Sequence, residues 1–135
     1  MRWTSVLRLR PGAQRRIRRG HLWVYRDELE PPLPAIEAGE LVRLETADQH
    51  DLGSGFYHPT SKIAVRLLSW NGDADSAFFR QRIARALALR RSFYADRTTY
   101  RLVFGEADFL PGLIVDRYGE YIAVQYLSAG MERRS

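Results

Sequence analysis

Residues 53–69 read GSGFYHPTSKIAVRLLS, and this stretch decides the fold of the first half of the chain. It contains two strand-like runs, Gly53–Tyr57 and Ile63–Leu68, which are separated by a short polar loop. Short runs rich in β-branched and aromatic residues and bounded by Gly, Pro and Ser are typical of β-strands. The stretch therefore predicts two strands close together in sequence.

Further strands are predicted on the N-terminal side of this pair. They are Trp3–Arg10, which ends at Pro11-Gly12, His21–Tyr25 and Leu41–Leu44. A Pro-rich loop at 31–34 interrupts them, since proline disfavours both helix and inner strand. Short strands at regular spacing are the rhythm of a small barrel, so we predict a compact β-barrel over residues 1–70.

Basic residues are concentrated at the N-terminus. Residues 1–26 contain no acid and eight arginines, which are Arg2, Arg8, Arg10, Arg15, Arg16, Arg18, Arg19 and Arg26. The remaining 109 residues hold 13 basic and 16 acidic side chains, so the N-terminal stretch alone produces the net charge of +5. Four of these arginines fall in a short helix predicted for 13–19, which Gly20 ends. Clustered positive charge favours an anionic partner such as nucleic acid.

Composition excludes several classes of protein. The chain has no cysteine, so it has no disulfide framework, thiolate metal site or thiol nucleophile. No apolar run approaches the roughly 18 residues that span a bilayer, and no uninterrupted apolar signal-peptide core follows Met1. We therefore expect a cytoplasmic protein with no membrane partner.

The second half of the chain begins with a helical pattern. We predict a helix from Asp75 or Ser76 to about Tyr94, with an apolar side made of Phe79, Ile83, Ala86, Leu87 and Phe93. Its five arginines have no acid beside them in the helix, and Arg90 projects into the apolar arc when angles are counted along the helix. Arg90 either pairs inside the fold or extends its head to solvent.

Three strands are predicted after this helix, at 100–106, 113–118 and 121–127. Leu110–Leu113 fits a type II turn and Gly119-Glu120 fits a two-residue hairpin, so the strands form an antiparallel meander. The fold class is therefore α+β and mainly β. The last two strands are apolar on both faces and Ser128 is predicted as a helix N-cap, so we expect a chain that is truncated. Its uncovered faces could produce a homodimer.

A resemblance to a known family rests on five motifs in the same order. They are Arg10-Pro11-Gly12, RRIRRGHLWVY (15–25), GSGFYHPTSKIAVRLLS (53–69), YRLVFGEADFLPGLIVDRYG (100–119) and QYLSAGME (125–132). Together they resemble the class I S-adenosylmethionine-dependent methyltransferases that make 5-methylcytosine in large-subunit ribosomal RNA. The similarity covers nearly the whole chain, and the motif at 100–119 is long and specific.

The resemblance implies a domain order. Residues 1–70 are expected to be an RNA-binding PUA-like domain, 71–97 a connector with the basic helix, and 98–135 the start of a central β-rich domain. The family's Rossmann-like catalytic domain is expected to be missing, because the sequence has neither its two catalytic cysteines nor a G-x-G-x-x-G loop. We therefore expect no cofactor in this chain, although S-adenosylmethionine is the cofactor of full-length members, and we expect no activity from the chain alone.

Candidate RNA-binding residues fall in two groups. The first joins the arginines of the short helix to aromatic residues, and charge beside an aromatic surface is a common way to hold RNA. The second follows the stretch at 53–69, where small residues and one lysine can approach a phosphate. The candidates are Arg15, Arg16, Arg18, Arg19, His21, Trp23, Tyr57, Lys62 and Arg66. For Trp23 we favour a core residue over a stacking surface, whereas Lys62 is equally interpretable as part of a tight loop and Arg66 as the partner of an acid.

Carboxylates offer a second type of chemistry. Glu106, Asp108 and Asp116 could suggest acid–base catalysis or a divalent metal, but no nucleophile or positioned His accompanies them. We favour the interpretation that these carboxylates cap helices and form turns. Asp48, His50 and Asp51 lack the spacing of a known metal site, and a polar hairpin loop is the better interpretation. We predict neither catalytic nor metal-binding residues.

Three functions are therefore compared. The first is an RNA-binding portion that positions large-subunit rRNA for methyl transfer by a domain outside this chain. The second is a freestanding PUA-like RNA-binding protein. The third, which we favour least, is a small hydrolase that uses the carboxylates of the meander.

Overall fold

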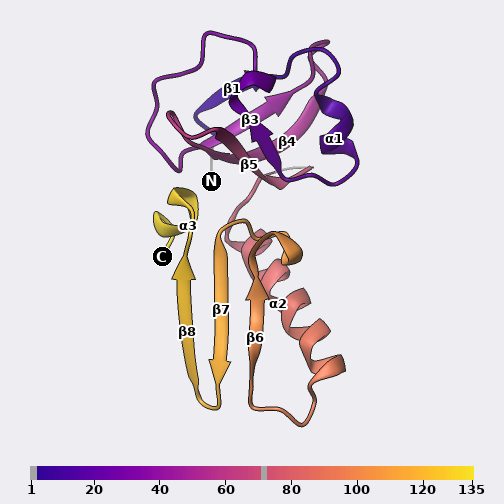
Figure 1. The fold of residues 1–135 in the computed structure, drawn as a ribbon, viewed down its shortest axis with the longest axis vertical. Coiled ribbons are helices and arrows are strands. Elements are labelled where there is room, and N and C mark those ends of the chain that lie inside the picture. Colours follow the sequence, from indigo (N-terminus) through magenta and orange to yellow (C-terminus); the bar gives the residue numbers. More distant parts are fainter. Residues whose placement is uncertain (1–2, 71–72) are drawn as a thin grey trace.

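The computed structural model describes residues 3–70 and 73–135 (Figure 1). Met1, Arg2 of the basic stretch, and Asn71 and Gly72 of the predicted connector lie outside the described residues. The chain forms two sheets, and we call residues 3–70 the barrel unit and residues 73–135 the meander unit. None of the helices in the described ranges is long and apolar enough to cross a membrane.

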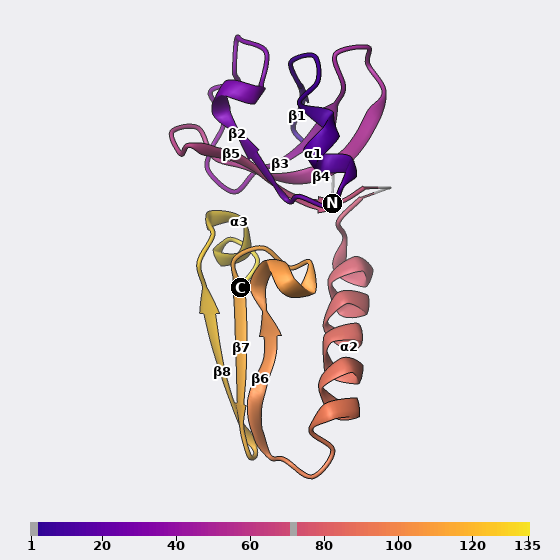
Figure 2. The same cartoon turned by 45° about the vertical axis from the view of Figure 1, so that its right-hand side comes forward.

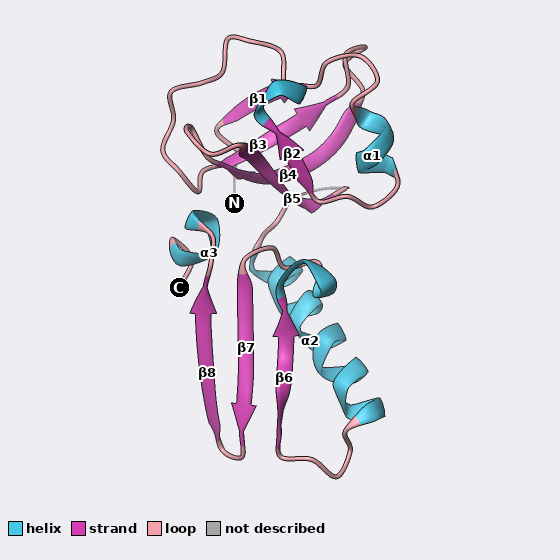
Figure 3. Ribbon diagram, viewed as in Figure 1, coloured by secondary structure: helices cyan, strands magenta, loops and turns pink. Residues whose placement is uncertain are grey.

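The barrel unit is built on a five-stranded sheet in the order β1-β3-β4-β5-β2 (Figure 3). The strands are β1 (Ser5–Arg8), β2 (Trp23–Tyr25), β3 (Leu41–Glu45), β4 (Asp51–Tyr57) and β5 (Ile63–Ser69). β1 pairs with β3 in parallel, whereas the other pairs are antiparallel. The predicted strand at 3–10 is shorter than expected, and beyond it Leu9 forms only an isolated bridge to Leu29.

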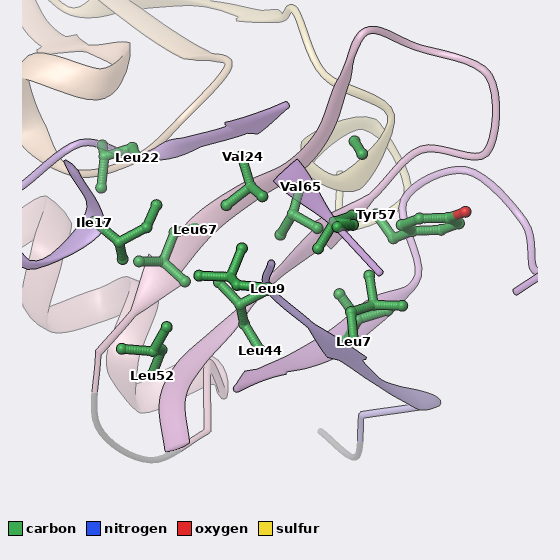
Figure 4. Packing of buried hydrophobic residues seen from close by; sticks show 13 residues of the cluster. Leu7, Leu9, Ile17, Leu22, Val24, Leu44, Leu52, Tyr57, Val65 and Leu67 are labelled. Atoms are coloured by element: carbon green, nitrogen blue, oxygen red, sulfur yellow. The ribbon is translucent and has the colours of Figure 1, made fainter. Parts of the chain in front are cut away.

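One apolar core lies between these strands and the short helix α1 (Gln14–Arg18) (Figure 4). Leu9, Ile17, Leu44 and Leu67 are fully buried in it. Burial of each such side chain contributes about 1.5–3 kcal/mol relative to exposure. Ile17 is the buried residue of α1 that joins this core, whereas Arg15 and Arg18 are exposed.

The two glycines of the 53–69 stretch stand at positions that have no room for a side chain. A Cβ on Gly53 would lie 1.8 Å from the carbonyl oxygen of Ser69, and one on Gly55 would lie 2.4 Å from that of Arg66. Both contacts are between backbones of β4 and β5, so neither strand could stay in place. The two glycines therefore bring β4 and β5 together.

The meander unit starts with α2 (Ser76–Phe93), which is capped by the Asp75 carboxylate accepting from the Phe78 amide at 2.8 Å. The predicted apolar side is only partly confirmed. Ala86 is buried and Phe79 packs against the core, but Ile83 is 39% exposed and Phe93 is 74% exposed. The prediction failed for these two because Ile83 lines an open cleft beside two strands of the sheet that follows and Phe93 is the last residue of the helix.

A three-stranded antiparallel sheet follows in the order β6-β7-β8, which confirms the meander and the mixed, mainly β fold. The strands are β6 (Thr99–Phe104), β7 (Leu113–Tyr118) and β8 (Tyr121–Tyr126). β6 ends earlier than predicted, because 105–108 forms the 3-10 helix η2 (Gly105–Asp108). The turn at 110–113 forms with Gly112 at φ 82°, and Ser128 caps the last helix, α3 (Ala129–Glu132).

The C-terminal helix α3 lies against the barrel unit, as both views show (Figures 1 and 2). A Cβ on Gly130 would lie 2.0 Å from the Phe56 ring, so the helix backbone rests directly on that ring. Arg133 donates to Glu37 and Glu40 at 2.8 Å each. These contacts set the position of the meander unit relative to the barrel unit.

Candidate RNA-binding surface and the Trp23 pocket

The α1 helix and its C-terminal cap residue carry arginines at the surface. Arg15, Arg18 and Arg19 are exposed, and none of them has an ion pair within the described ranges. Gly20 ends the helix with φ at 98°, a conformation that other residues adopt with strain. The chain then returns as β2, and the α1 arginine that contacts an aromatic ring of β2 is Arg16, which lies over Tyr25.

Arg16 has a different role from its neighbours. Its guanidinium pairs with the Glu28 carboxylate, donates to the Trp23 carbonyl at 3.3 Å and lies 5.1 Å from the Tyr25 ring centroid. Glu28 also accepts from the Tyr25 amide at 3.2 Å. Arg16 therefore fixes the end of α1 against β2, and its charge is already compensated.

Trp23 lies between the two units. Its indole Nε1 donates to the Glu106 carboxylate of η2 at 3.2 Å, and the Arg66 guanidinium lies 5.5 Å from its ring centroid. Arg66 also reaches the same Glu106 oxygen at 3.5 Å. Trp23 is half-buried, so it is a wall of a surface pocket as well as a packing residue.

This pocket, which we call the Trp23 pocket, has a volume of about 320 Å³. It is lined by Arg16, Gly20, His21, Leu22, Trp23, Tyr25 and Glu106. The size falls within the range of small-ligand clefts, and its walls combine aromatic rings with a few charged groups. Four predicted site residues thus come together here, since Arg16, His21 and Trp23 line the pocket and Arg66 packs on Trp23.

Two other predicted site residues lie elsewhere. Tyr57 is 1% exposed, and its hydroxyl donates to the Pro34 carbonyl at 3.1 Å, so its ring belongs to the core and offers no surface to RNA. Lys62 is exposed and lines a separate hollow together with Tyr25, Arg26 and Thr60. It has no ion pair within the described residues and stays a candidate for phosphate contact.

The carboxylates of the meander unit have structural partners. Asp108 forms two hydrogen bonds with Arg90, at 2.5 and 2.7 Å, so Arg90 pairs inside the fold. Asp116 accepts from Arg101 at 2.8 Å, and this hydrogen bond holds the pKa of Asp116 below its ordinary value. Glu106 is separate from both, because it faces Trp23.

No group of three or more potential metal ligands occurs among the described residues. In the loop before β4, His50 and Asp48 lie 3.0 Å apart and are both exposed. The hydrogen bond from Thr46 to Asp48, at 2.6 Å, lowers the pKa of that carboxyl. Asp51 pairs with Arg43 instead, so the three residues form a hydrogen-bonded polar hairpin loop.

Glu106 was not among the predicted RNA-binding residues. It is 83 positions from Trp23 in sequence, and its local motif, Gly105-Glu106-Ala107-Asp108, only suggests a turn. It is the packing of the two units against each other that brings Glu106 to Trp23 of β2. No signal within the motif itself distinguishes Glu106 from Asp108, which serves the turn.

Comparison with known proteins agrees with the fold and the motifs. Residues 7–70 match the PUA-like domain family. The chain is 34% identical over 134 residues to the ribosomal RNA large subunit methyltransferase I of Pseudoalteromonas atlantica, and 35% identical over 132 residues to that of Shewanella frigidimarina. The chain is therefore similar to one part of these methyltransferases. These alignments cover 96% and 94% of the chain but only 34% and 33% of the relatives, so the chain spans about a third of their length.

Solved structures share the fold of the PUA-like domain and of the meander unit. A protein from Streptococcus mutans that is assigned as a SAM-dependent methyltransferase matches 97% of the chain and 35% of its own length, with a TM-score of 0.82 and 19% identity. A second methyltransferase structure, complexed with SAH, matches with the same TM-score over 97% of the chain and 34% of its own length. At this identity the likeness establishes the fold alone.

Proposed function

We propose that this chain binds large-subunit ribosomal RNA and positions it for methyl transfer by a catalytic domain that these 135 residues do not include. The observation that carries the proposal is the group of three exposed arginines on α1 and at its C-terminal cap, which have no ion pair among the described residues and adjoin the Trp23 pocket in sequence. Arginine offers a planar fork that matches phosphate oxygens. The names of the relatives supply the substrate class.

The proposed division of work follows the two units. Residues 1–70 contact the RNA, residues 71–97 form the connector with the basic helix, and residues 98–135 begin a central domain that links RNA binding to catalysis. S-adenosylmethionine is bound by the catalytic domain in this scheme, and no residue of this chain is assigned to it. The cytoplasm, where ribosomal RNA is modified in bacteria, is the proposed location.

A freestanding RNA-binding protein is the alternative. The PUA-like match at 7–70 favours it equally, because RNA binding by the barrel unit needs no partner domain. The two proposals differ in the role of the meander unit, which in the first proposal joins the RNA-binding domain to a catalytic domain. Methyl transfer to rRNA upon addition of a separately produced catalytic domain would favour the first proposal.

Charge reversal on α1 tests RNA binding. The double variant Arg15→Glu with Arg18→Glu is titrated against a fluorescent fragment of large-subunit rRNA at two salt concentrations, with unrelated duplex RNA as competitor. Each lost phosphate contact reduces the slope of log K against log salt by about 0.7 to 0.9. We expect a slope that is smaller by about 1.5 and weaker binding at low salt.

The matched control is Arg85→Glu with Arg91→Glu on α2. Both residues are exposed and the change in net charge is the same. If α1 is the contact surface, the control retains most of the wild-type slope. Equal losses in the two variants would show that total charge, and not α1, produces the binding, and an unchanged slope in the α1 variant would exclude this surface.

A further inference from the structure

We propose that the Trp23 pocket accepts an unpaired guanine base of the bound RNA and that Glu106 recognises its Watson–Crick edge. This inference rests on the RNA binding proposed above and adds a base-specific site to it. Sequence-specific RNA recognition mostly uses unpaired bases, which stack on aromatic side chains and are hydrogen-bonded along their edges. The Trp23 pocket offers both kinds of contact.

The charges around the pocket separate a place for phosphate from a place for a base. Arg15, Arg18 and Arg19 lie outside the pocket and have no acidic partner within the described ranges. Inside it, the Arg16 charge is compensated by Glu28, and the Glu106 carboxylate repels a phosphate. The group that enters the pocket should therefore be uncharged and should carry N–H donors, whereas the phosphates follow α1.

Aromatic surfaces are available for stacking. His21, Trp23 and Tyr25 all line the pocket. Arg66 covers part of the Trp23 ring but is not a lining residue, so it supports the indole from outside the cavity. Base stacking on an aromatic side chain contributes to the binding of every base, since each has a flat π-face. Stacking therefore explains affinity and leaves selection to Glu106.

The Glu106 carboxylate is oriented before any ligand arrives. Its Oε1 atom accepts from Trp23 Nε1 at 3.2 Å and from Arg66 at 3.5 Å. Its Oε2 atom has no hydrogen-bond partner among the described residues. The side chain is 39% exposed. A carboxylate held in this way has no donor and offers an incoming group its Oε2, and offers Oε1 where the incoming donor replaces the long contact from Arg66.

Guanine matches this arrangement better than the other bases. Its Watson–Crick edge places N1–H and the N2 amine side by side, so one donor meets the Glu106 Oε2 atom and the other meets Oε1 in place of the 3.5 Å contact from Arg66. Uracil has a single N–H between two carbonyls, which Glu106 would repel. Adenine and cytosine each place an amine next to a ring nitrogen that is an acceptor. A bidentate contact to a base edge commonly discriminates by about 5- to 100-fold.

The experiment uses nine-nucleotide uridine RNAs with a fluorescent label and one central position that is guanosine, inosine, adenosine or uridine. Anisotropy titrations at low salt give the dissociation constants for the full chain. We expect guanosine to bind about tenfold tighter than uridine or adenosine. Inosine, which keeps N1–H but lacks the N2 amine, should fall between them.

Glu106→Gln is the decisive variant. It keeps the size of the side chain but removes one acceptor, so the preference for guanosine should fall below about twofold, while the uridine RNA binds as tightly as to wild type or tighter. If Glu106 had a merely structural role, the variant would bind both the guanosine RNA and the uridine RNA more weakly. The matched control, Glu120→Gln, removes the same charge from the exposed turn between β7 and β8 and should keep the guanosine preference.

The outcomes separate this inference from the proposed function. Equal binding of all four RNAs by the wild-type chain, a guanosine preference retained in Glu106→Gln, or binding of the rRNA fragment without binding of any nonamer would each overturn the base pocket and leave RNA binding intact. Absence of binding to the nonamers and to the rRNA fragment alike would overturn both proposals.

Discussion

The barrel unit and the meander unit bury their apolar residues to very different extents. In the described part of the barrel unit only Trp3 and Val6 are large apolar residues with exposed side chains, whereas residues 73–135 contain twelve. Every residue of β8 is exposed. The barrel unit closes its core with residues of its own, and the meander unit leaves the edge strand β8 and much apolar surface without cover.

This difference indicates where each unit can make contacts. Contacts of the barrel unit with a partner must use charged and aromatic groups at its surface, as α1 and the Trp23 pocket do. The meander unit has a cleft of about 690 Å³ between α2, β7 and β8, with a mainly apolar lining that includes Phe79, Val124 and Met131. Apolar patches of this kind are typical of surfaces that pack against protein.

The largest expected effect comes from a cavity in the barrel core. Leu67→Ala should lower the free energy of unfolding by about 4 kcal/mol, since the side chain is fully buried and its neighbours cannot fill the space. Ile122 on β8 is 60% exposed, so Ile122→Ala should change the free energy of unfolding by less than about 0.5 kcal/mol. Urea unfolding measures both, and similar losses would remove the contrast between the units.

Two spectroscopic signals can follow the units separately. All three tryptophans, Trp3, Trp23 and Trp70, belong to the barrel unit, whereas the longest helix, α2, belongs to the meander unit. Tryptophan fluorescence therefore reports mainly on the barrel, with a contribution from the contacts of Trp23 and Trp70 with Glu106 and Phe109, and far-ultraviolet circular dichroism reports mainly on α2. Leu67→Ala should shift the fluorescence transition to lower urea.

Asp108→Ala should weaken the meander unit specifically. The carboxylate is 5% exposed, holds Arg90 of α2 through two hydrogen bonds and accepts from the Phe104 amide at 2.7 Å. Its loss should cost about 2 kcal/mol, because Arg90 and the Phe104 amide lose their acceptor. The dichroism transition should move and the fluorescence transition should move less. Asp96→Ala, an exposed acid of the same unit, is the control and should shift neither.

The two units also differ in how far the sequence predicted them. The strands of the barrel were predicted within a few residues, because alternation, glycines and turns are local signals. The exposure of Phe93 was not predicted, since the sequence of a helix does not show how much of its length a sheet will cover. The site follows the same rule: the α1 arginines are visible as a cluster in sequence, but Glu106 reaches Trp23 only through the packing of the two units.

The exposed edge at β8 makes concentration-dependent self-association the next expected effect. Among the described strands β8 pairs only with β7, so its outer backbone groups can pair with a second copy. In sedimentation velocity the chain should shift towards dimer as its concentration rises, and Ile122→Lys should reduce this shift by placing a charge on the edge. Leu89→Lys on α2 is the matched control, with 51% exposure. Equal effects of the two lysines would place the contact away from β8.

The smallest expected effect concerns the Arg101–Asp116 pair between β6 and β7. The hydrogen bond from Arg101 lowers the pKa of Asp116 below its ordinary value of 3.8. A carboxyl whose pKa is lowered by folding adds stability above its unfolded pKa and loses it as the pH falls through the folded pKa. The advantage of wild type over Asp116→Asn should therefore be full near neutral pH and should shrink below about pH 3.8.

Urea midpoints followed by dichroism at several pH values measure this advantage. Arg101→Gln should give the same pH dependence as Asp116→Asn. The double variant should lose no more unfolding free energy than the two single variants' losses added together, because the two residues share one interaction. The pair is on the surface of the meander sheet, so the barrel fluorescence transition should stay the same in all three variants. A difference from wild type that is constant across the acid range would mean that the hydrogen bond, although present, does not stabilise the folded state through the charge of Asp116.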